Sequence, residues 1–127
     1  MNAMATASNS TVTSFAEFEY FTGMTVIPDN YLRYWSNLTF FKLPSTCTTI
    51  GNYFYTADTD TPRRTFNANK ILEIPDSVQT IGSYCFICRF TGEIRFGKGL
   101  KTIGYWNFRL IDPSVLEFPD SLTYLGG

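Results

Sequence analysis

The chain has 127 residues, 44% of them apolar, which is enough to bury the core of one folded domain. Its formal net charge of −1 argues against nucleic acid or an anionic membrane as a partner, because both are held by clustered positive charge. Histidine is absent, which excludes Ser-His-Asp and Cys-His catalytic sites and histidine-bound metal sites.

The first segment in chain order, residues 1–14, is expected to be disordered or a leader segment. It lacks the charged and apolar regions of a signal peptide. No apolar run approaches the ~18 residues that a membrane-spanning helix needs, so membrane insertion is not expected.

A short unit ending in an aliphatic residue and a turn residue recurs from residue 24 onward, and such a period predicts stacked repeats. Its copies are Val26-Ile27-Pro28, Thr49-Ile50-Gly51, Thr80-Ile81-Gly82, Thr102-Ile103-Gly104 and Tyr124-Leu125-Gly126. Successive copies lie 23, 31, 22 and 22 residues apart. The long step contains the polar stretch 56–65 (TADTDTPRRT), which is expected to be an insertion loop. Repeats are therefore predicted near 24–45, 46–76, 77–98 and 99–120, with a partial one at 121–127.

A second signature follows each unit and alternates apolar, charged and apolar residues, as a half-buried strand does. Its copies are Phe40–Pro44, Ile71–Pro75, Glu93–Gly97 and Val115–Pro119. Stacking predicts two inward columns, one of Phe41, Leu72, Ile94 and Leu116 and one of Leu43, Ile74, Phe96 and Phe118. Two more columns are predicted on the other wall, one of Met24, Cys47, Val78, Leu100 and Leu122 and one of Ile27, Ile50, Ile81, Ile103 and Leu125.

The outward positions of these strands form the candidate partner-binding face. One outward position of each strand carries charges that alternate in sign from strand to strand (Lys42, Glu73, Arg95 and Glu117). The other is mostly apolar (Phe40, Ile71, Glu93 and Val115). In order along the chain, the face comprises Phe40, Lys42, Ile71, Glu73, Glu93, Arg95, Val115 and Glu117. The alternating charges avoid like-charge neighbours, which also serves solubility and strand register. Extended repeat surfaces are commonly used for binding, so the more specific interpretation is that this face contacts a partner.

The phrases IPDSVQTIGSYCF, GLKTIGYWNF and FPDSLTYLGG resemble the BspA-like leucine-rich repeats of surface proteins from anaerobic gut and oral bacteria. The opening TSFAEFEYFTGMTVIP resembles the lead-in to such repeats, so the resemblance covers residues 13–127. It implies a leucine-rich-repeat right-handed solenoid over residues 15–127, with a parallel sheet on one face and turns or short helical pieces on the other. It also implies a cell-surface or secreted location and adhesion to host or bacterial surface proteins.

Catalytic and metal sites have weaker support in the sequence. Cys85 and Cys88 have the C-x-x-C spacing of redox and zinc motifs, but with Cys47 as the only other cysteine we expect buried packing. Asp58 and Asp60 hint at calcium, yet Pro62 and Arg63 follow where further ligands would be needed. We therefore expect no cofactor and no enzymatic activity.

Three further interpretations stay open at the level of sequence. Glycoside cleavage would need two carboxylates to meet in space, from the set Glu73, Asp76, Glu93 and Glu117. Another possibility is a structural spacer or phage-type decoration protein that associates with itself through its repeat ends. Aromatic residues are more numerous than a small stack needs, and packing on the convex wall is the favoured explanation for Tyr34, Trp35, Tyr105 and Trp106. Phe40 is the exception, because it shares the outward strand position of the candidate face.

Overall fold

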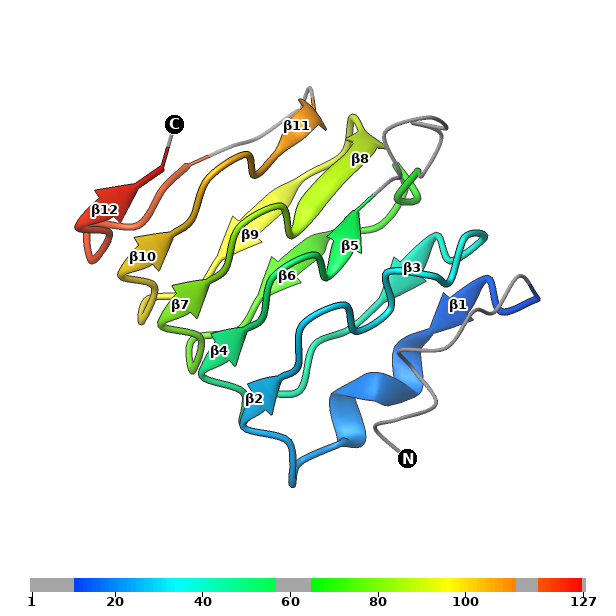
Figure 1. Ribbon diagram of the computed structural model, residues 1–127, viewed down its shortest axis with the longest axis horizontal. Coiled ribbons are helices and arrows are strands. Elements are labelled where there is room, and N and C mark those ends of the chain that lie inside the picture. The colour runs from blue at the N-terminus through cyan, green and yellow to red at the C-terminus, as the bar shows by residue number, and fades with distance from the viewer. Residues whose placement is uncertain (1–10, 57–64, 112–116, 127) are drawn as a thin grey trace.

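The computed structural model describes residues 11–56, 65–111 and 117–126, and within them the chain forms a solenoid of parallel strands (Figure 1). Each strand pair in these residues is parallel, as expected for successive coils that run in the same direction. The predicted repeat solenoid is confirmed. The only helix in the described part is a short 3-10 helix, η1 (Ala16–Tyr20).

The recurring units that end in an aliphatic residue and a turn residue form the sheet with the most strands in the described part of the chain. Its strands are β2 (Val26–Ile27), β4 (Thr49–Ile50), β7 (Thr80–Ile81), β10 (Thr102–Ile103) and β12 (Tyr124–Leu125), and they lie side by side in chain order (Figure 1). The pairing sets Ile50 opposite Ile27 and Ile81, and Ile103 opposite Ile81 and Leu125. All four isoleucines are fully buried, which confirms this predicted column, although Leu125 at its end is 51% exposed.

Glycine follows the isoleucine because successive coils approach closely at this corner. A Cβ atom on Gly51 would lie 2.6 Å from the carbonyl oxygen of Ile27, too close for any side chain. Pro28 occupies the same position in the first unit. Its strand β2 is the edge of the sheet, with no described strand beyond it, so the same restriction does not apply.

A second sheet lies on another wall and was not singled out in the sequence. It contains β5 (Tyr55–Thr56), β8 (Phe86–Phe90) and β11 (Arg109–Ile111) in the order β11-β8-β5. Thr56 belongs to β5, and Thr65 forms an isolated bridge with Arg89, so both ends of the expected 56–65 insertion are part of the fold. Residues 57–64, with Asp58, Asp60 and Pro62, lie outside the described residues.

The third wall carries the alternating segments, and here the expected continuous sheet is wrong. Strands β6 (Leu72–Ile74) and β9 (Ile94–Phe96) pair in the predicted register, but β3 (Phe40–Phe41) pairs with β1 (Ser14–Phe15) instead of β6. After Asn67 donates its N–H to the Thr39 carbonyl, the chain makes a tight turn closed by Lys70, and β6 starts beyond it without joining β3. Val115 and Leu116 lie outside the described residues, and 117–119 form no strand.

The core lies between these walls. Phe41, Leu72 and Ile94 are nearly fully buried, as are Leu43 and Ile74, so the described members of the two inward columns pack as predicted up to β9. Phe96 is half-buried, and Phe118 is 40% exposed. In the remaining predicted column Met24, Cys47, Val78 and Leu100 are buried, while Leu122 is half-buried.

The N-terminal end of the stack is covered by η1. Phe18 is fully buried, with its ring centroid 5.4 Å from that of Tyr31 and 6.4 Å from that of Phe54. Strand β1 begins at Ser14, the last residue of the segment 1–14 that is expected from the sequence to be disordered or a leader segment. Residues 1–10 of that segment lie outside the described residues.

Candidate functional site

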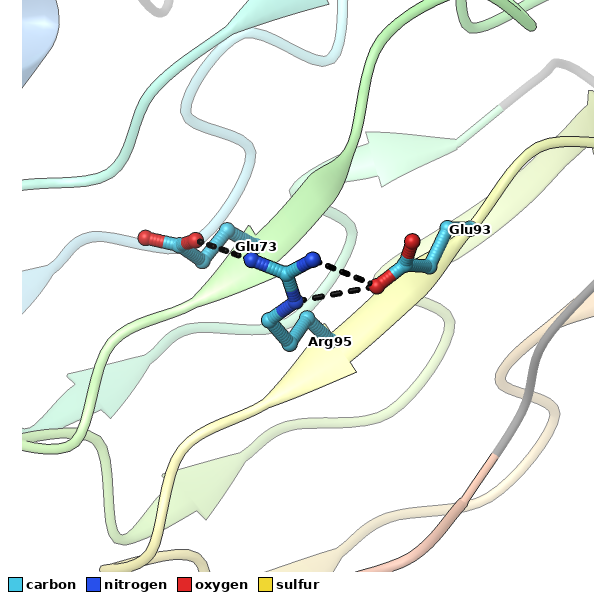
Figure 2. Close-up of polar contacts among 3 residues, drawn as sticks. All are labelled: Glu73, Glu93 and Arg95. Atoms are coloured by element: carbon cyan, nitrogen blue, oxygen red, sulfur yellow. Dashed lines mark hydrogen bonds and ion pairs between the residues drawn. The ribbon is translucent and has the colours of Figure 1, made fainter.

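One ion pair of the predicted row of alternating charges (Lys42, Glu73, Arg95 and Glu117) forms, and it joins β6 to β9. Glu73 and Arg95 face each other in the strand register, and Arg95 Nη1 lies 3.9 Å from Glu73 Oε2. Figure 2 shows that the same guanidinium also holds Glu93, with Nη2 and Nε at 2.8 and 2.9 Å from Glu93 Oε2. The Arg95 and Glu73 side chains are 56% and 63% exposed, so solvent screens the pair and limits its contribution to about 0–1 kcal/mol.

The outer members of that row, Lys42 and Glu117, form no ion pair in the described part of the chain. Lys42 is exposed and has no ion-pair partner there, because β3 and β6 are not neighbours in one sheet. Glu117 is exposed as well, and no described cation pairs with it. The predicted continuous row of alternating charges is therefore reduced to its centre.

The predicted apolar row on this face is also discontinuous. Phe40 is half-buried, with its ring 5.8 Å from that of Phe66 and the ammonium of Lys70 5.3 Å above it. Ile71 is 37% exposed and is the aliphatic group that the face offers to a partner. Val115, the last apolar member, lies outside the described residues.

A groove of about 380 Å³ opens on this face, where β3 and β6 fail to pair. It is lined by Glu19, Phe40, Phe41, Lys42, Leu43, Asn69, Lys70, Ile71, Glu73 and Pro75. A second groove, of about 510 Å³, is also lined by Glu73 and extends to Arg95, Phe96 and Lys98. The structure thus brings Phe40, Lys42, Ile71 and Glu73 together around one hollow.

A stack of aromatic rings at the corner after the glycines was missed by the sequence reasoning. The rings of Tyr53 and Tyr84 lie 5.0 Å apart and nearly parallel, Trp106 follows at 6.3 Å, and the Arg33 guanidinium lies 4.6 Å from the Tyr53 centroid. All three aromatic residues have a positive φ, from 57° to 59°. The available signal was an aromatic residue two positions after each glycine.

The other aromatic residues singled out in the sequence are divided between core and surface. Trp35 is buried, whereas Tyr34, Tyr105 and Trp106 are 40%, 54% and 48% exposed. Packing on the convex wall therefore does not account for the whole set. Tyr105 also shares a hydroxyl–hydroxyl hydrogen bond of 2.9 Å with Tyr124.

The three cysteines are buried thiols with no disulfide. Burial raises the pKa of the Cys47 thiol to about 11 and that of the Cys85 thiol to about 12. Cys85 Sγ also donates to the Gly51 carbonyl at 3.0 Å, and Cys88 lies on the inner side of β8. Because the thiolate is the reactive and metal-binding form, this environment disfavours redox and metal chemistry at the C-x-x-C motif.

The carboxylates considered for glycoside cleavage are engaged in structural contacts. Glu73 and Glu93 both contact Arg95, and Asp76 Oδ1 accepts the backbone N–H of Lys98 at 2.8 Å. Glu117, the fourth of these carboxylates, is exposed. Across residues 11–56, 65–111 and 117–126, no cluster of three or more acidic, cysteine or histidine side chains could hold a metal ion.

Comparison with known proteins gives one match. The family model described as "BspA type Leucine rich repeat region (6 copies)" matches residues 5–61 and 60–127. Neither the curated proteins nor the solved structures yield a significant match. In the described residues no helix is long and apolar enough to cross a membrane.

Proposed function

The chain belongs to the BspA type leucine-rich repeat family, and from this premise we propose that it is a non-enzymatic protein-binding or adhesion module of a bacterial surface or secreted protein. Repeat scaffolds of this kind present extended surfaces to partner proteins. The proposed partner is a protein of the host or of a bacterial surface. Ligand identity is a property of the exposed site, since the scaffold is shared across the family.

The observation that carries this proposal is the groove on the candidate face. Four residues named from the strand pattern, Phe40, Lys42, Ile71 and Glu73, line one hollow of about 380 Å³. An exposed aliphatic group, a half-buried aromatic ring and two unlike charges give a partner both apolar contact and polar specificity.

A matched set of variants tests the binding face. A photoreactive residue at Ile71 supplies a crosslinked partner from cell-surface extracts. The purified partner is then titrated calorimetrically against wild type, Phe40→Ser/Ile71→Ser and Val26→Ser. Val26 is the control because it is an exposed β-branched residue, 55% exposed, on a different sheet.

We expect the double variant to weaken binding about tenfold and Val26→Ser to leave the dissociation constant unchanged, since buried hot-spot contacts dominate such interfaces. Ile71 and Val26 are exposed, whereas Phe40 packs partly against the core, so the double variant should lose some stability and keep its fold. Circular dichroism and urea denaturation of all three proteins check that they are folded under the conditions of the titration. Equal affinities for wild type and the double variant would remove this face from the binding site.

A second candidate function, a structural spacer that associates through its repeat ends, is supported by one observation. Two core columns end in exposed groups, Leu125 at 51% and Phe118 at 40% exposure, and the neighbouring Tyr124 is 46% exposed. Exposed apolar columns of this kind are what stacked repeats bury against the next unit.

A further inference from the structure

Tyr105 and Tyr124 form an exposed pair of phenols on neighbouring coils. Tyr124 lies in β12, which pairs with β10, and Tyr105 follows β10 after Gly104 (Figure 1). The Tyr124 hydroxyl donates to the Tyr105 hydroxyl at 2.9 Å, and the two residues are 46% and 54% exposed. Because both rings lie on the surface, core packing does not account for their contact.

The backbone fixes both residues on either side of this contact. Tyr105 donates its N–H to Ser83 Oγ at 3.0 Å, and its carbonyl accepts the N–H of Tyr84 at 2.9 Å. Tyr124 donates its N–H to the Lys101 carbonyl at 3.1 Å. The stacking of the coils therefore brings the two rings together, and a reaction between them has the high effective concentration of an intramolecular step.

The orientation of the two rings favours a bond between their edges. The ring centroids lie 6.4 Å apart with the planes at 89°, and the edges that carry the hydroxyls meet. In a phenoxyl radical the unpaired electron is shared with the ortho carbons, which lie beside the oxygen. A bond between two aromatic rings runs along the plane of each ring, so it joins edges and not faces. The hydroxyl contact thus brings together the atoms that two tyrosyl radicals join.

A second tyrosine pair provides the contrast. The ring centroids of Tyr53 and Tyr84 are closer, at 5.0 Å, but the planes are nearly parallel, so the rings meet through their faces. Both residues are half-buried, Tyr84 also stacks on Trp106, and the Arg33 guanidinium lies over Tyr53. A nearby positive charge disfavours loss of an electron from the Tyr53 ring. Of the two pairs, only the exposed one is oriented for coupling.

We propose that Tyr105 and Tyr124 are an oxidative cross-linking site, at which hydrogen peroxide activated by a haem peroxidase joins the two rings through their ortho carbons. Each phenol loses one electron and its hydroxyl proton, and the two ortho carbons form a bond. The two ortho hydrogens then leave as protons while both oxygens regain theirs. The peroxide takes up the two electrons and two protons and becomes two molecules of water. This modification goes beyond the proposed binding function and does not depend on it.

The cross-link secures a strand that has little apolar burial. Leu122 is half-buried and Leu125 is 51% exposed, while backbone hydrogen bonds from Thr123, Tyr124 and Gly126 attach β12 to the preceding coil. A covalent link between residues 19 positions apart limits how far this coil opens, as a disulfide does.

The test treats the purified full chain, at low protein concentration, with a haem peroxidase and limited hydrogen peroxide. Wild type is compared with Tyr105→Phe, Tyr124→Phe and, as the matched control from the other pair, Tyr84→Phe. Phenylalanine keeps the ring but lacks the hydroxyl from which the radical forms. Biphenol fluorescence and intact mass measure the reaction, and mass spectrometry of the digested protein locates the link.

We expect the wild-type monomer to lose the mass of two hydrogen atoms and to contain a link between residues 105 and 124. Tyr105→Phe and Tyr124→Phe should each lower the fluorescence yield of the monomer about tenfold, whereas Tyr84→Phe should leave it unchanged. In the cross-linked protein, amide hydrogen exchange at Tyr124 and Gly126 should slow, because β12 opens less readily.

Three results would overturn the proposal. Cross-links confined to covalent dimers, through an exposed residue such as Tyr20 at 74% exposure, would show that the pair is not arranged for coupling. A link between Tyr53 and Tyr84, or a monomer yield that Tyr124→Phe does not change, would assign the reaction to other rings. Unchanged amide exchange at β12 in the linked protein would contradict its stabilising role.

Discussion

At the scale of single residues, one repeat position links successive coils through side chains of different types. Asp29 Oδ1 accepts the backbone N–H of Asn52, Asn52 Oδ1 accepts that of Ser83, and Ser83 Oγ accepts that of Tyr105, at 2.8, 2.8 and 3.0 Å. Three residue types serve one role because each offers a short oxygen acceptor. A search for identical residues at the repeat spacing does not reveal this row of hydrogen bonds, because the residue type changes from coil to coil while the acceptor role is kept.

The buried thiols make folding sensitive to alkaline pH. The pKa values of Cys47 and Cys85 are raised to about 11 and about 12, from an ordinary value of 9.0. The unfolded chain therefore loses these protons near pH 9, while the folded chain keeps them. The stabilisation is fully present below pH 9 and is lost as the pH rises toward 11–12, at up to about 1.4 kcal/mol per pH unit for each thiol.

We expect the free energy of unfolding in urea to fall between pH 8.5 and 10.5, and to fall less steeply in Cys85→Ala. The slope with pH is the relevant quantity, because alanine also removes the contact of Cys85 Sγ with the Gly51 carbonyl. Parallel slopes for wild type and variant would show that Cys85 ionises equally easily in both states.

At the scale of elements, very short strands are stabilised by their position in a stack. Each strand of the five-stranded sheet has two residues, and an isolated pair of that length has little stability in water. Burial of one aliphatic side chain per coil against its neighbours supplies the missing free energy. The column from Ile27 to Ile103 is therefore the main contribution of this wall to stability.

Truncating a central member of that column should be costly. Ile81 is fully buried with Ile50 and Ile103 opposite it in the register, so we expect Ile81→Ala to lower the free energy of unfolding by about 2–5 kcal/mol. Leu125→Ala, at the exposed end of the same column, should cost much less. Urea denaturation of both variants measures the contrast, and similar losses would contradict the assignment of Leu125 to the surface.

At the scale of the whole molecule, the two ends of the solenoid differ. The 3-10 helix η1 and strand β12 lie at opposite ends of the solenoid (Figure 1). Phe18 of η1 is fully buried, while Tyr124 and Leu125 of β12 are exposed. An exposed strand edge with apolar side chains favours association with a similar surface.

We therefore expect the chain to associate at high concentration through its β12 end, with Leu125→Lys shifting the equilibrium toward monomer. Sedimentation velocity over a hundredfold concentration range measures this shift. Val26→Lys, at the opposite edge strand, is the matched control. A monomer at every concentration would exclude the spacer alternative and leave the binding module.

The sequence by itself determined the solenoid and most of its core. A period of 22 residues with one aliphatic residue at a fixed place allows few structures other than stacked coils, so Ile27, Ile50, Ile81 and Ile103 could be assigned to one column before any coordinates. The register that sets Glu73 opposite Arg95 follows from the same period, because alternation fixes which side chains face outward.

Only the tertiary structure decided how the candidate face is built. The separation of β3 from β6, and with it the groove beside Ile71, depends on a turn closed by Lys70 and on the pairing of β3 with β1. The stack of Tyr53 and Tyr84 likewise depends on a left-handed backbone at each corner. These features arise from contacts between distant segments, and local periodicity does not encode them because it reports only which side of a strand a residue occupies.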